Sequence, residues 1–295
     1  MQTNTMKKSK NLVLITLLLS CATAVTGQKK MLLGGSGWNK IVIIDKETKT
    51  IEWEHPINPG EECNCVDYTK DGKVLYAYRS GAKLIDKDKN TIWDFKVNPE
   101  TEELQTAKQL PEGGFLIGIA GSPLRIGELD KKGNKRSEIT YNTGIADKHG
   151  QLRIIEKTPE KTYLVPLMES GKILEIDQKG NLINTIQAVG NVFSAKMLGK
   201  KQILVSCGDV HCYQIFDRKV KLLKQISQDE YENVKLLFVA EIAPWKNNLF
   251  ITNWSGHSSH QSEPTLIEVT PDNKIVWSLD DKSVFKNISS VKLIP

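Results

Sequence analysis

The sequence lacks the features of several specialised classes of protein. Glycine (21 of 295 residues) and proline (11) are too scarce for a collagen-like or disordered chain. Only one apolar run approaches the length of a membrane span. No charge of one sign dominates, because 40 basic residues face 35 acidic ones. A disordered chain and a multispanning membrane protein are therefore excluded, and the length suffices for one large core or two small ones.

The apolar run lies at the N-terminus and predicts an export signal. Three lysines, Lys7, Lys8 and Lys10, precede the apolar residues from Leu12 to Leu19, and small residues follow them. A transmembrane anchor is the alternative, but the run is short and polar residues follow it at once. We divide the chain into a signal peptide, residues 1–27, and a mature protein, residues 28–295, which we expect to have no transmembrane span.

Cleavage after Gly27 would leave 268 residues with 37 basic and 35 acidic side chains. A nearly neutral protein gives no electrostatic case for nucleic acid as a partner. Two kinds of cleavage stay open. Residues Leu18 to Cys21 loosely resemble a lipobox, in which a lipid on Cys21 would anchor an outer-membrane lipoprotein. We favour a freely soluble exported protein, periplasmic or extracellular.

One phrase recurs six times along the mature chain: an apolar pair, an aspartate, a short polar turn and a second β-rich run. Successive copies are 40 to 53 residues apart, which suits a four-stranded propeller blade. A further hairpin precedes each copy, and no long helical periodicity interrupts them. The anchor residues of the six copies are Asp45, Asp86, Asp130, Asp177, Asp217 and Thr270.

The two ends of the chain complete one another. Residues 288–295 read as a single strand, whereas residues 29–54 supply three strands that lack a first one. Pairing these segments would close a ring and remove exposed sheet edges. The prediction is an all-β protein, a single six-bladed β-propeller closed by the C-terminal strand pairing with the N-terminal blade.

Aligning the innermost strands reveals six charged residues whose signs alternate around the ring, which is consistent only with an even number of blades. We favour a structural role, in which each charge lies between two opposite charges near the central channel and its desolvation is offset. The alternative is a polar channel that binds a ligand. The six residues are Asp67, Lys108, Glu156, Lys196, Glu241 and Lys292.

Propeller connectivity places short turns on one face and longer, more varied loops on the other, where binding sites are usually built. Four of the five histidines belong to this long-loop face. Histidine can act as acid, base or metal ligand, and tryptophan or tyrosine offers a stacking surface. The alternative is that these are solvated loop residues. The candidate binding residues are Trp38, Tyr78, Arg79, Arg125, His149, Glu169, Asp209, His211, Trp254, His257 and His260.

Metal binding has weak support. His257 and His260 could coordinate a metal with Asp209 or Glu263, but a His-x-x-His spacing on a loop is much less specific than the helical zinc signatures. We predict no metal site.

The cysteines suggest one disulfide in an oxidising compartment. Cys207 and Cys212 flank a hairpin loop, so a bond that pins this loop is the leading interpretation. Cys63 and Cys65 are two residues apart on one strand and cannot easily bridge to each other.

The phrases IDKETKTIEWE, IDKDKNTIWDF and VTPDNKIVWSL resemble the repeats of quinoprotein-like propellers, and the resemblance covers nearly all of the mature chain. It implies repeat architecture and not activity. Pyrroloquinoline quinone dehydrogenases usually carry adjacent cysteines, which this sequence lacks, so we predict no cofactor. The blades are also similar to those of bacterial arylsulfotransferases, exported six-bladed propellers that use a histidine at the channel mouth. His211 and His257 are the nearest counterparts in kind.

Two functions follow. The first is an exported non-catalytic propeller that binds a small molecule, glycan or protein through its long-loop face. The alternative is an exported enzyme, a transferase, lyase or hydrolase, with His211, His257 or His260 as acid, base or nucleophile and Arg79 or Arg125 holding an anion. Binding is favoured because neither a phosphate-binding glycine loop nor a Gly-x-Ser-x-Gly elbow occurs.

Overall fold

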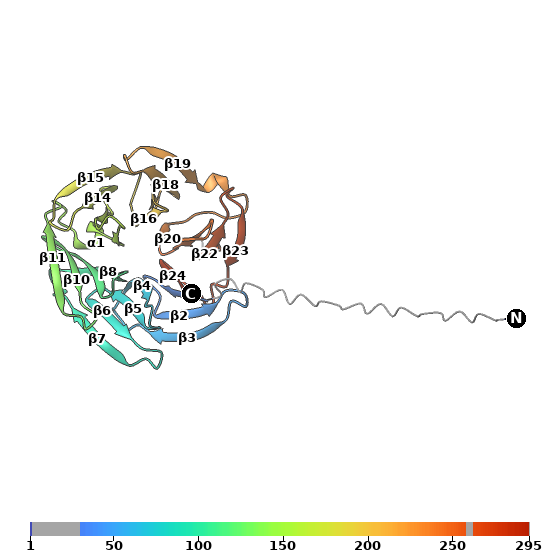
Figure 1. Ribbon diagram of the computed structural model, residues 1–295, viewed down its shortest axis with the longest axis horizontal. Coiled ribbons are helices and arrows are strands. Elements are labelled where there is room, and N and C mark those ends of the chain that lie inside the picture. Colours follow the sequence, from blue (N-terminus) through green and yellow to red (C-terminus); the bar gives the residue numbers. More distant parts are fainter. Residues whose placement is uncertain (2–29, 258–261, 295) are drawn as a thin grey trace.

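The short β-rich runs of the described sequence form 24 strands, which the computed structural model arranges as six four-stranded antiparallel sheets around a central axis (Figure 1). The structure describes residues 1, 30–257 and 262–294. Besides strands, these residues contain the short helix α1 (Lys148–Gln151) and a 3-10 turn (Gln228–Glu230). The predicted six-bladed, all-β propeller is confirmed.

Each blade consists of four strands that follow one another from the central axis outward. Blade 1 contains β24 (Ser290–Ile294), β1 (Lys30–Gly34), β2 (Lys40–Asp45) and β3 (Ile51–Pro56). Blade 2 contains β4 (Cys63–Tyr68), β5 (Val74–Tyr78), β6 (Gly81–Ile85) and β7 (Thr91–Lys96). Blade 3 contains β8 (Glu103–Gln109), β9 (Phe115–Ala120), β10 (Leu124–Leu129) and β11 (Lys135–Tyr141). Blade 4 contains β12 (Glu156–Lys157), β13 (Tyr163–Leu167), β14 (Lys172–Ile176) and β15 (Leu182–Gln187). Blade 5 contains β16 (Ser194–Leu198), β17 (Gln202–Ser206), β18 (Cys212–Asp217) and β19 (Leu222–Ser227). Blade 6 contains β20 (Val239–Trp245), β21 (Asn248–Asn253), β22 (Leu266–Val269) and β23 (Ile275–Leu279).

The ring is closed by the two ends of the described chain. β24 pairs antiparallel with β1 over five residues, with Leu32 opposite Lys292. The C-terminal strand is thus the innermost strand of blade 1, and the N-terminal segment supplies the other three. Closure in this way completes blade 1, so β1 does not present an exposed, unpaired edge toward the axis.

The recurring aspartate has a local structural role. In blade 2, Asp86 Oδ1 accepts hydrogen bonds from the backbone N–H groups of Asp88 and Asn90, both at 2.9 Å. Equivalent bonds form at Asp130, Asp177 and Asp217. A short side chain that bonds to its own turn stabilises the reversal between the two outer strands. This explains why the aspartate repeats without any catalytic role.

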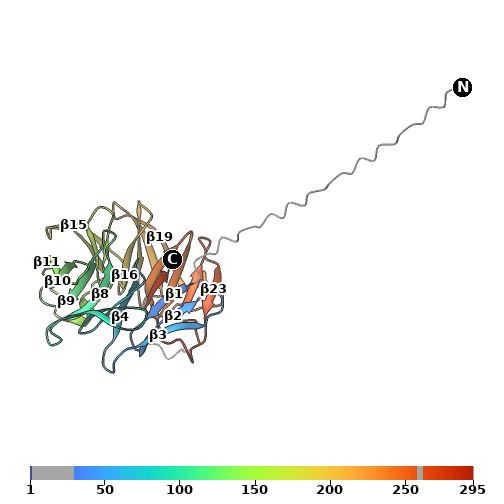
Figure 2. The ribbon, with the colours of Figure 1, turned by 60° about the horizontal axis from the view of Figure 1, so that its bottom comes forward.

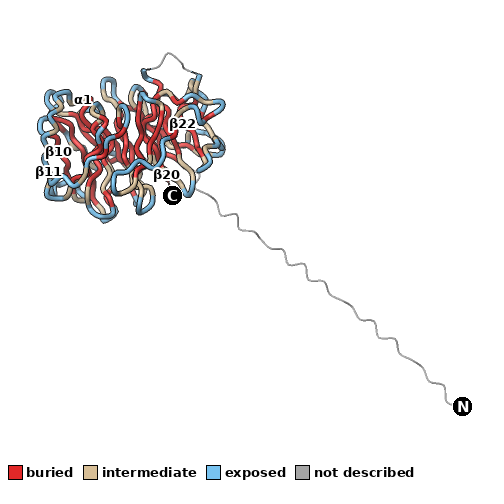
Figure 3. The backbone as a smooth tube through the Cα atoms, turned by 90° about the horizontal axis from the view of Figure 1, so that it is seen from above, coloured by how far each residue is buried: buried red, intermediate tan, exposed pale blue. Residues whose placement is uncertain are grey.

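Burial follows the position of a strand in its blade. Every residue of β5 and β9 is buried, whereas β7 alternates between exposed and half-buried residues. Inner strands are covered on both sides by neighbouring blades, and the outer strands face solvent; in Figure 3 the buried segments occupy the interior.

The outer tryptophans join blades: Trp53 Nε1 donates to Lys87 O and Trp277 Nε1 to Lys46 O, each at 2.9 Å.

The strands run between two faces of the ring, as the tilted view in Figure 2 shows. Tight turns such as Asp71-Gly72, between the first and second strands of blade 2, lie on one face. The loops between the second and third strands, and those that lead into the next blade, lie on the other. Helix α1 belongs to the loop between blades 3 and 4, on the long-loop face. The central channel therefore has two distinct ends, one at the tight-turn face and one at the long-loop face.

Candidate ligand-binding site at the channel mouth

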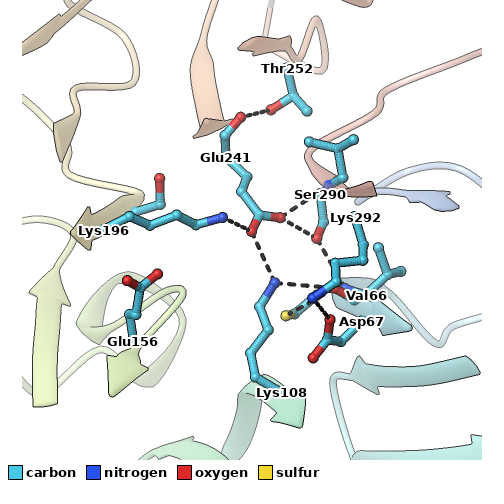
Figure 4. Close-up of polar contacts among 12 residues, drawn as sticks. Val66, Asp67, Lys108, Glu156, Lys196, Glu241, Thr252, Ser290 and Lys292 are labelled. Atoms are coloured by element: carbon cyan, nitrogen blue, oxygen red, sulfur yellow. Dashed lines mark hydrogen bonds and ion pairs between the residues drawn. The ribbon is translucent and has the colours of Figure 1, made fainter. Parts of the chain in front are cut away.

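The channel end on the tight-turn side holds the six charged residues of the predicted ring. Glu241 of β20 is fully buried, and its carboxylate points toward Lys108 and Lys196 (Figure 4). Its Oε1 accepts from Lys108 Nζ at 2.9 Å and from Lys196 Nζ at 2.5 Å. Burial alone would raise the pKa of Glu241, but the two lysines lower it to about 2. The carboxylate therefore stays ionised in the interior.

The pairing differs from a uniform alternating ring. Lys292 pairs with Asp67 of the neighbouring blade at 2.7 Å, as expected. Lys108, in contrast, crosses the axis from blade 3 to reach Glu241 in blade 6. Glu156 forms no ion pair within the described part of the chain and instead accepts from Met197 N at 3.0 Å. Burial raises the pKa of Glu156. Because the long side chain of Lys108 reaches the carboxylate of Glu241 across the axis, the ion pairs do not follow the alternating order of charges around the ring.

The opposite end opens into a cavity of about 310 Å³ on the long-loop face, which we call the mouth cavity. Its walls come from loops and inner strand ends spread along the chain, and they divide into an aromatic side and a charged side. The lining residues are Ser36, Glu62, Asn64, Arg79, His149, Arg153, Met168, Asn191, Phe193, Phe238, Trp254, His257 and Ser289.

The aromatic side is a continuous series of rings. Phe193 and Phe238 meet edge to face at 5.8 Å between centroids, and Phe238 meets Trp254 in the same way at 5.4 Å. His257 follows at 4.7 Å from Trp254. Trp254 Nε1 donates to Ser36 O at 2.8 Å, which fixes the indole against blade 1. Such a wall offers apolar area to a ring-shaped ligand at little cost in side-chain entropy.

The charged side is organised by Glu103, which is almost fully buried. Its carboxylate lies 3.4 Å from Arg79 Nε and 3.0 Å from His149 Nδ1. Arg79 also pairs with Glu62 at 2.8 Å. Burial would raise the pKa of Glu103, but the hydrogen bond from His149 and the charge of Arg79 lower it overall. Both Glu62 and Glu103 are thus engaged by cationic or donor groups of the wall.

Arg153 is the most buried cation of the mouth cavity, with 7% of its surface exposed. Its guanidinium packs over the ring of Phe193 at 5.8 Å and donates to the carbonyl oxygens of His149 and Leu152. Among the described residues it forms no ion pair with a carboxylate. Burial lowers the pKa of Arg153 to about 10, so the group remains charged at neutral pH.

The two ring nitrogens of His149 have different partners. Its Nδ1 faces the Glu103 carboxylate, and its Nε2 lies 3.2 Å from Arg153 Nη2, which can only donate. An imidazole that donates through Nδ1 and accepts through Nε2 would satisfy both contacts. Asp147 caps α1 by accepting from the N–H groups of His149 and Gly150, and so positions the ring.

Four of the predicted binding residues line the mouth cavity: Arg79, His149, Trp254 and His257. Asp209 lies beside it, 3.4 Å from His257 Nδ1. His260 lies outside the described residues.

The other predicted binding residues have different surroundings. Trp38 packs against Phe285, and Tyr78 donates to Asp94 at 2.8 Å. Arg125 pairs with Glu102 and Glu138, and His211 Nδ1 lies 2.8 Å from Leu237 O. The backbone N–H of Glu169 donates to Gly150 O. The residues that the structure does not bring into the mouth cavity are Trp38, Tyr78, Arg125, Glu169 and His211.

The cysteines are all buried thiols in the part of the chain that the structure describes. Cys207 and Cys212 are hydrogen-bonded to each other across the hairpin that carries Asp209, and this contact raises the pKa of Cys207. Their disulfide stays a prediction. Burial raises the pKa of Cys63 and Cys65 on β4, so neither is a reactive thiolate.

Sequence reasoning missed a second ring of residues, each three positions before a member of the charge ring. Five of the six line the mouth cavity. In an uninterrupted strand, residues three apart point to opposite faces. β4, β8 and β20 carry a β-bulge at this point, which changes the direction of the side chains. The six residues are Asn64, Gln105, Arg153, Phe193, Phe238 and Ser289.

Two further features concern metals and membranes. Within residues 30–257 and 262–294, no three His, Cys, Asp or Glu side chains gather in an arrangement that could hold a metal. The helices of the same segments are all too short to cross a bilayer.

Fold and site together define a six-bladed β-propeller with an aromatic and charged cavity at one channel mouth. Residues 35–274 match the model of the Mal s 1 allergenic protein-like family, and the chain belongs to this family. A comparison with curated protein sequences gave no match.

Solved structures include similar propellers. A protein of unknown function from Bacteroides caccae is 39% identical, over 90% of this chain and 98% of that one, with a TM-score of 0.86. A catalytically inactive histidine-to-alanine variant of virginiamycin B lyase from Staphylococcus aureus, with quinupristin, is 14% identical over 86% of each chain, with a TM-score of 0.58. A streptogramin B lyase is 13% identical, over 87% of this chain and 84% of that one, also with a TM-score of 0.58. The two lyases show a shared fold alone.

Proposed function

We propose that this protein is an exported, non-catalytic propeller that binds a small molecule in the mouth cavity. The observation that carries the proposal is the joining of an aromatic wall to a charged wall in one concave site on the long-loop face. Its volume of about 310 Å³ lies at the lower end of the range for small-molecule sites. A ligand of one or a few rings fits these dimensions better than a glycan chain or a protein surface.

Trp254 provides the test of binding, and Trp277 is its matched control. Both belong to blade 6, and both indoles donate to a backbone carbonyl of blade 1, from Ser36 and Lys46 respectively. Only Trp254 lines the mouth cavity. The two substitutions to alanine therefore remove similar contacts between blades, and differ in what they remove from the site.

We would screen monosaccharides, nucleosides and aromatic acids, amides and alcohols by thermal shift. Ring-bearing compounds should raise the Tm of the wild type, because a ligand that binds only the native state stabilises it. Trp254→Ala should abolish the increase and Trp277→Ala should retain it. If no compound raises the Tm of the wild type, or if both variants respond alike, the proposal fails.

An enzyme is the second candidate, because two histidines of the mouth cavity are oriented by carboxylates. His257 Nδ1 lies 3.4 Å from Asp209, and His149 Nδ1 lies 3.0 Å from Glu103. A carboxylate that orients imidazole is a common part of acid–base sites. If a bound compound is recovered with a changed mass after incubation with the wild type, but unchanged after incubation with His257→Ala, the enzyme replaces the binding protein.

Export is part of the proposal and is supported by the basic and apolar N-terminal sequence. The intact mass of the mature protein from its native host distinguishes the two kinds of cleavage. Cleavage after Gly27 gives an unmodified chain, whereas a lipoprotein begins at a lipidated Cys21. A full-length, unprocessed protein would contradict export by either route.

A further inference from the structure

Arg153 differs from the three lysines of the charge ring. Lys108 and Lys196 pair with Glu241, and Lys292 pairs with Asp67. In the same channel Arg153 is only 7% exposed, yet its hydrogen bonds go only to neutral acceptors of His149 and Leu152 in the described chain. The charges of Glu62, Glu103 and Asp147 favour the charged form of Arg153, but burial outweighs them and lowers its pKa, so the chain compensates this buried cation only in part.

The nearby carboxylates are already engaged. Glu62 pairs with Arg79, and Glu103 contacts both Arg79 and His149. The guanidinium of Arg153 lines the mouth cavity, where it adjoins the aromatic wall at Phe193. A counter-charge can therefore reach it from the cavity without displacing a pair that the fold has formed.

We infer that the ligand of the mouth cavity carries an anionic group, which binds Arg153, on a ring that packs against Phe193, Phe238 and Trp254. This inference rests on the proposed function and adds the chemical class of the ligand. A planar guanidinium suits carboxylate, sulfate and phosphate groups, with which it forms paired, charge-assisted hydrogen bonds. The shared feature is a small ring compound with one acidic substituent.

Naphthalene-2-carboxylate and naphthalene-2-carboxamide test the charge at constant ring shape, and naphthalene-2-sulfonate tests which acid is preferred. Titration calorimetry would compare the three probes on wild type and Arg153→Met. The wild type should bind the carboxylate or the sulfonate about tenfold more tightly than the amide, as expected for a charge-assisted hydrogen bond. Arg153→Met should remove this preference and retain binding of the amide. Arg153→Lys should restore part of it.

The outcomes separate the inference from the proposed function. Equal affinities of wild type for acids and amide would overturn the anionic ligand and leave a ring-binding site. No binding of any probe would count against both. A preference that persists in Arg153→Met but disappears in Arg79→Met would assign the anion to Arg79 and overturn the role of Arg153. The comparison of probes on wild type needs no variant, so the inference can be tested even if Arg153→Met does not fold.

Discussion

The two ends of the channel are built from the same six inner strands, but they treat charge in opposite ways. At the tight-turn end, Glu241 is fully buried. Its carboxylate forms ion pairs with Lys108 and Lys196 and accepts hydrogen bonds from Ser290 Oγ and Val291 N. At the mouth, Arg153 is almost as buried and meets only neutral acceptors among the described residues. A charge satisfied within the chain stabilises the fold. A buried charge that the chain compensates only in part, such as Arg153, is where we infer that a ligand binds.

Removal of residues 288–295 should have the largest effect on stability, because these residues contribute side chains to both ends of the channel. Ser289 lines the mouth cavity, whereas Ser290 and Lys292 contact Glu241 and Asp67. Without β24, blade 1 loses its inner strand and the ring opens. We expect a loss of at least about 5 kcal/mol, seen as a fall in Tm of roughly 10 °C or more. An unchanged Tm would contradict closure by this strand.

Glu241→Gln tests the tight-turn end alone. The amide keeps the shape of the side chain but removes the carboxylate with which Lys108 and Lys196 form ion pairs, which should destabilise the protein by about 3–5 kcal/mol in urea unfolding. The exposed Glu160 serves as control, and Glu160→Gln should change stability by less than about 0.5 kcal/mol. Equal effects of the two substitutions would show that the central carboxylate is not stabilising.

The difference in stability between wild type and Glu241→Gln has a predictable dependence on pH. The pKa of Glu241 is about 2 in the folded protein against an ordinary value of 4.5, so the folded state binds the proton less tightly than the unfolded state does. The stabilisation by Glu241 is fully present above pH 4.5 and is lost as the pH falls toward 2. The difference in stability between wild type and Glu241→Gln should therefore shrink over this window. A constant difference would contradict the assignment.

The pair of cysteines Cys207 and Cys212 provides a test at the mouth end of the channel. A disulfide between Cys207 and Cys212 would pin the hairpin that carries Asp209 beside His257, and would stabilise the protein by about 2 kcal/mol for so short a loop. Protein isolated from an oxidising compartment should take up two fewer alkyl groups than reduced protein when denatured and alkylated. Reductant should lower its Tm, and should leave that of Cys207→Ser unchanged. Full alkylation without reductant would exclude the bond.

Arg153→Met should have the smallest effect on stability, in contrast to Glu241→Gln. Methionine replaces a buried charge by a shorter, unbranched apolar side chain, and the hydrogen bonds it removes go to a backbone carbonyl and an imidazole nitrogen. We expect a change of less than about 1 kcal/mol in either direction. A loss as large as that of Glu241→Gln would mean that Arg153 stabilises the fold as the ring charges do, and the two ends would no longer differ.

The fold could be predicted from the sequence because its repeat depends on local chemistry. An aspartate such as Asp86 bonds to the N–H groups of its own turn, and this need recurs in nearly every blade. The closure was also predictable, since the strand around Lys292 had no other partner in sequence. The same alignment identifies the charges on the inner strands, although Lys108 pairs across the axis instead of with a neighbour.

The site was only partly predictable. Composition identifies loop residues such as His149 and Trp254, but Tyr78 and Arg125 bond to nearby carboxylates and stay away from the cavity. Arg153 and Phe238 were missed because the alignment of inner strands singled out only one charged position in each strand, although both residues lie in loops that lead into the next blade. The direction in which Phe238 points depends on the bulge in β20, which no alternating pattern reveals.

A crystal structure of the protein soaked with naphthalene-2-carboxylate tests the central claim most directly, since a second cavity, lined by Lys108, Lys196 and Lys292, lies at the tight-turn end and could also take the probe. We predict that the carboxylate lies within hydrogen-bonding distance of Arg153 and that the rings contact Phe193, Phe238 or Trp254. Density for the probe at the tight-turn end beside Lys108 and Lys196, with an empty mouth cavity, would contradict the assignment of ligand binding to the mouth.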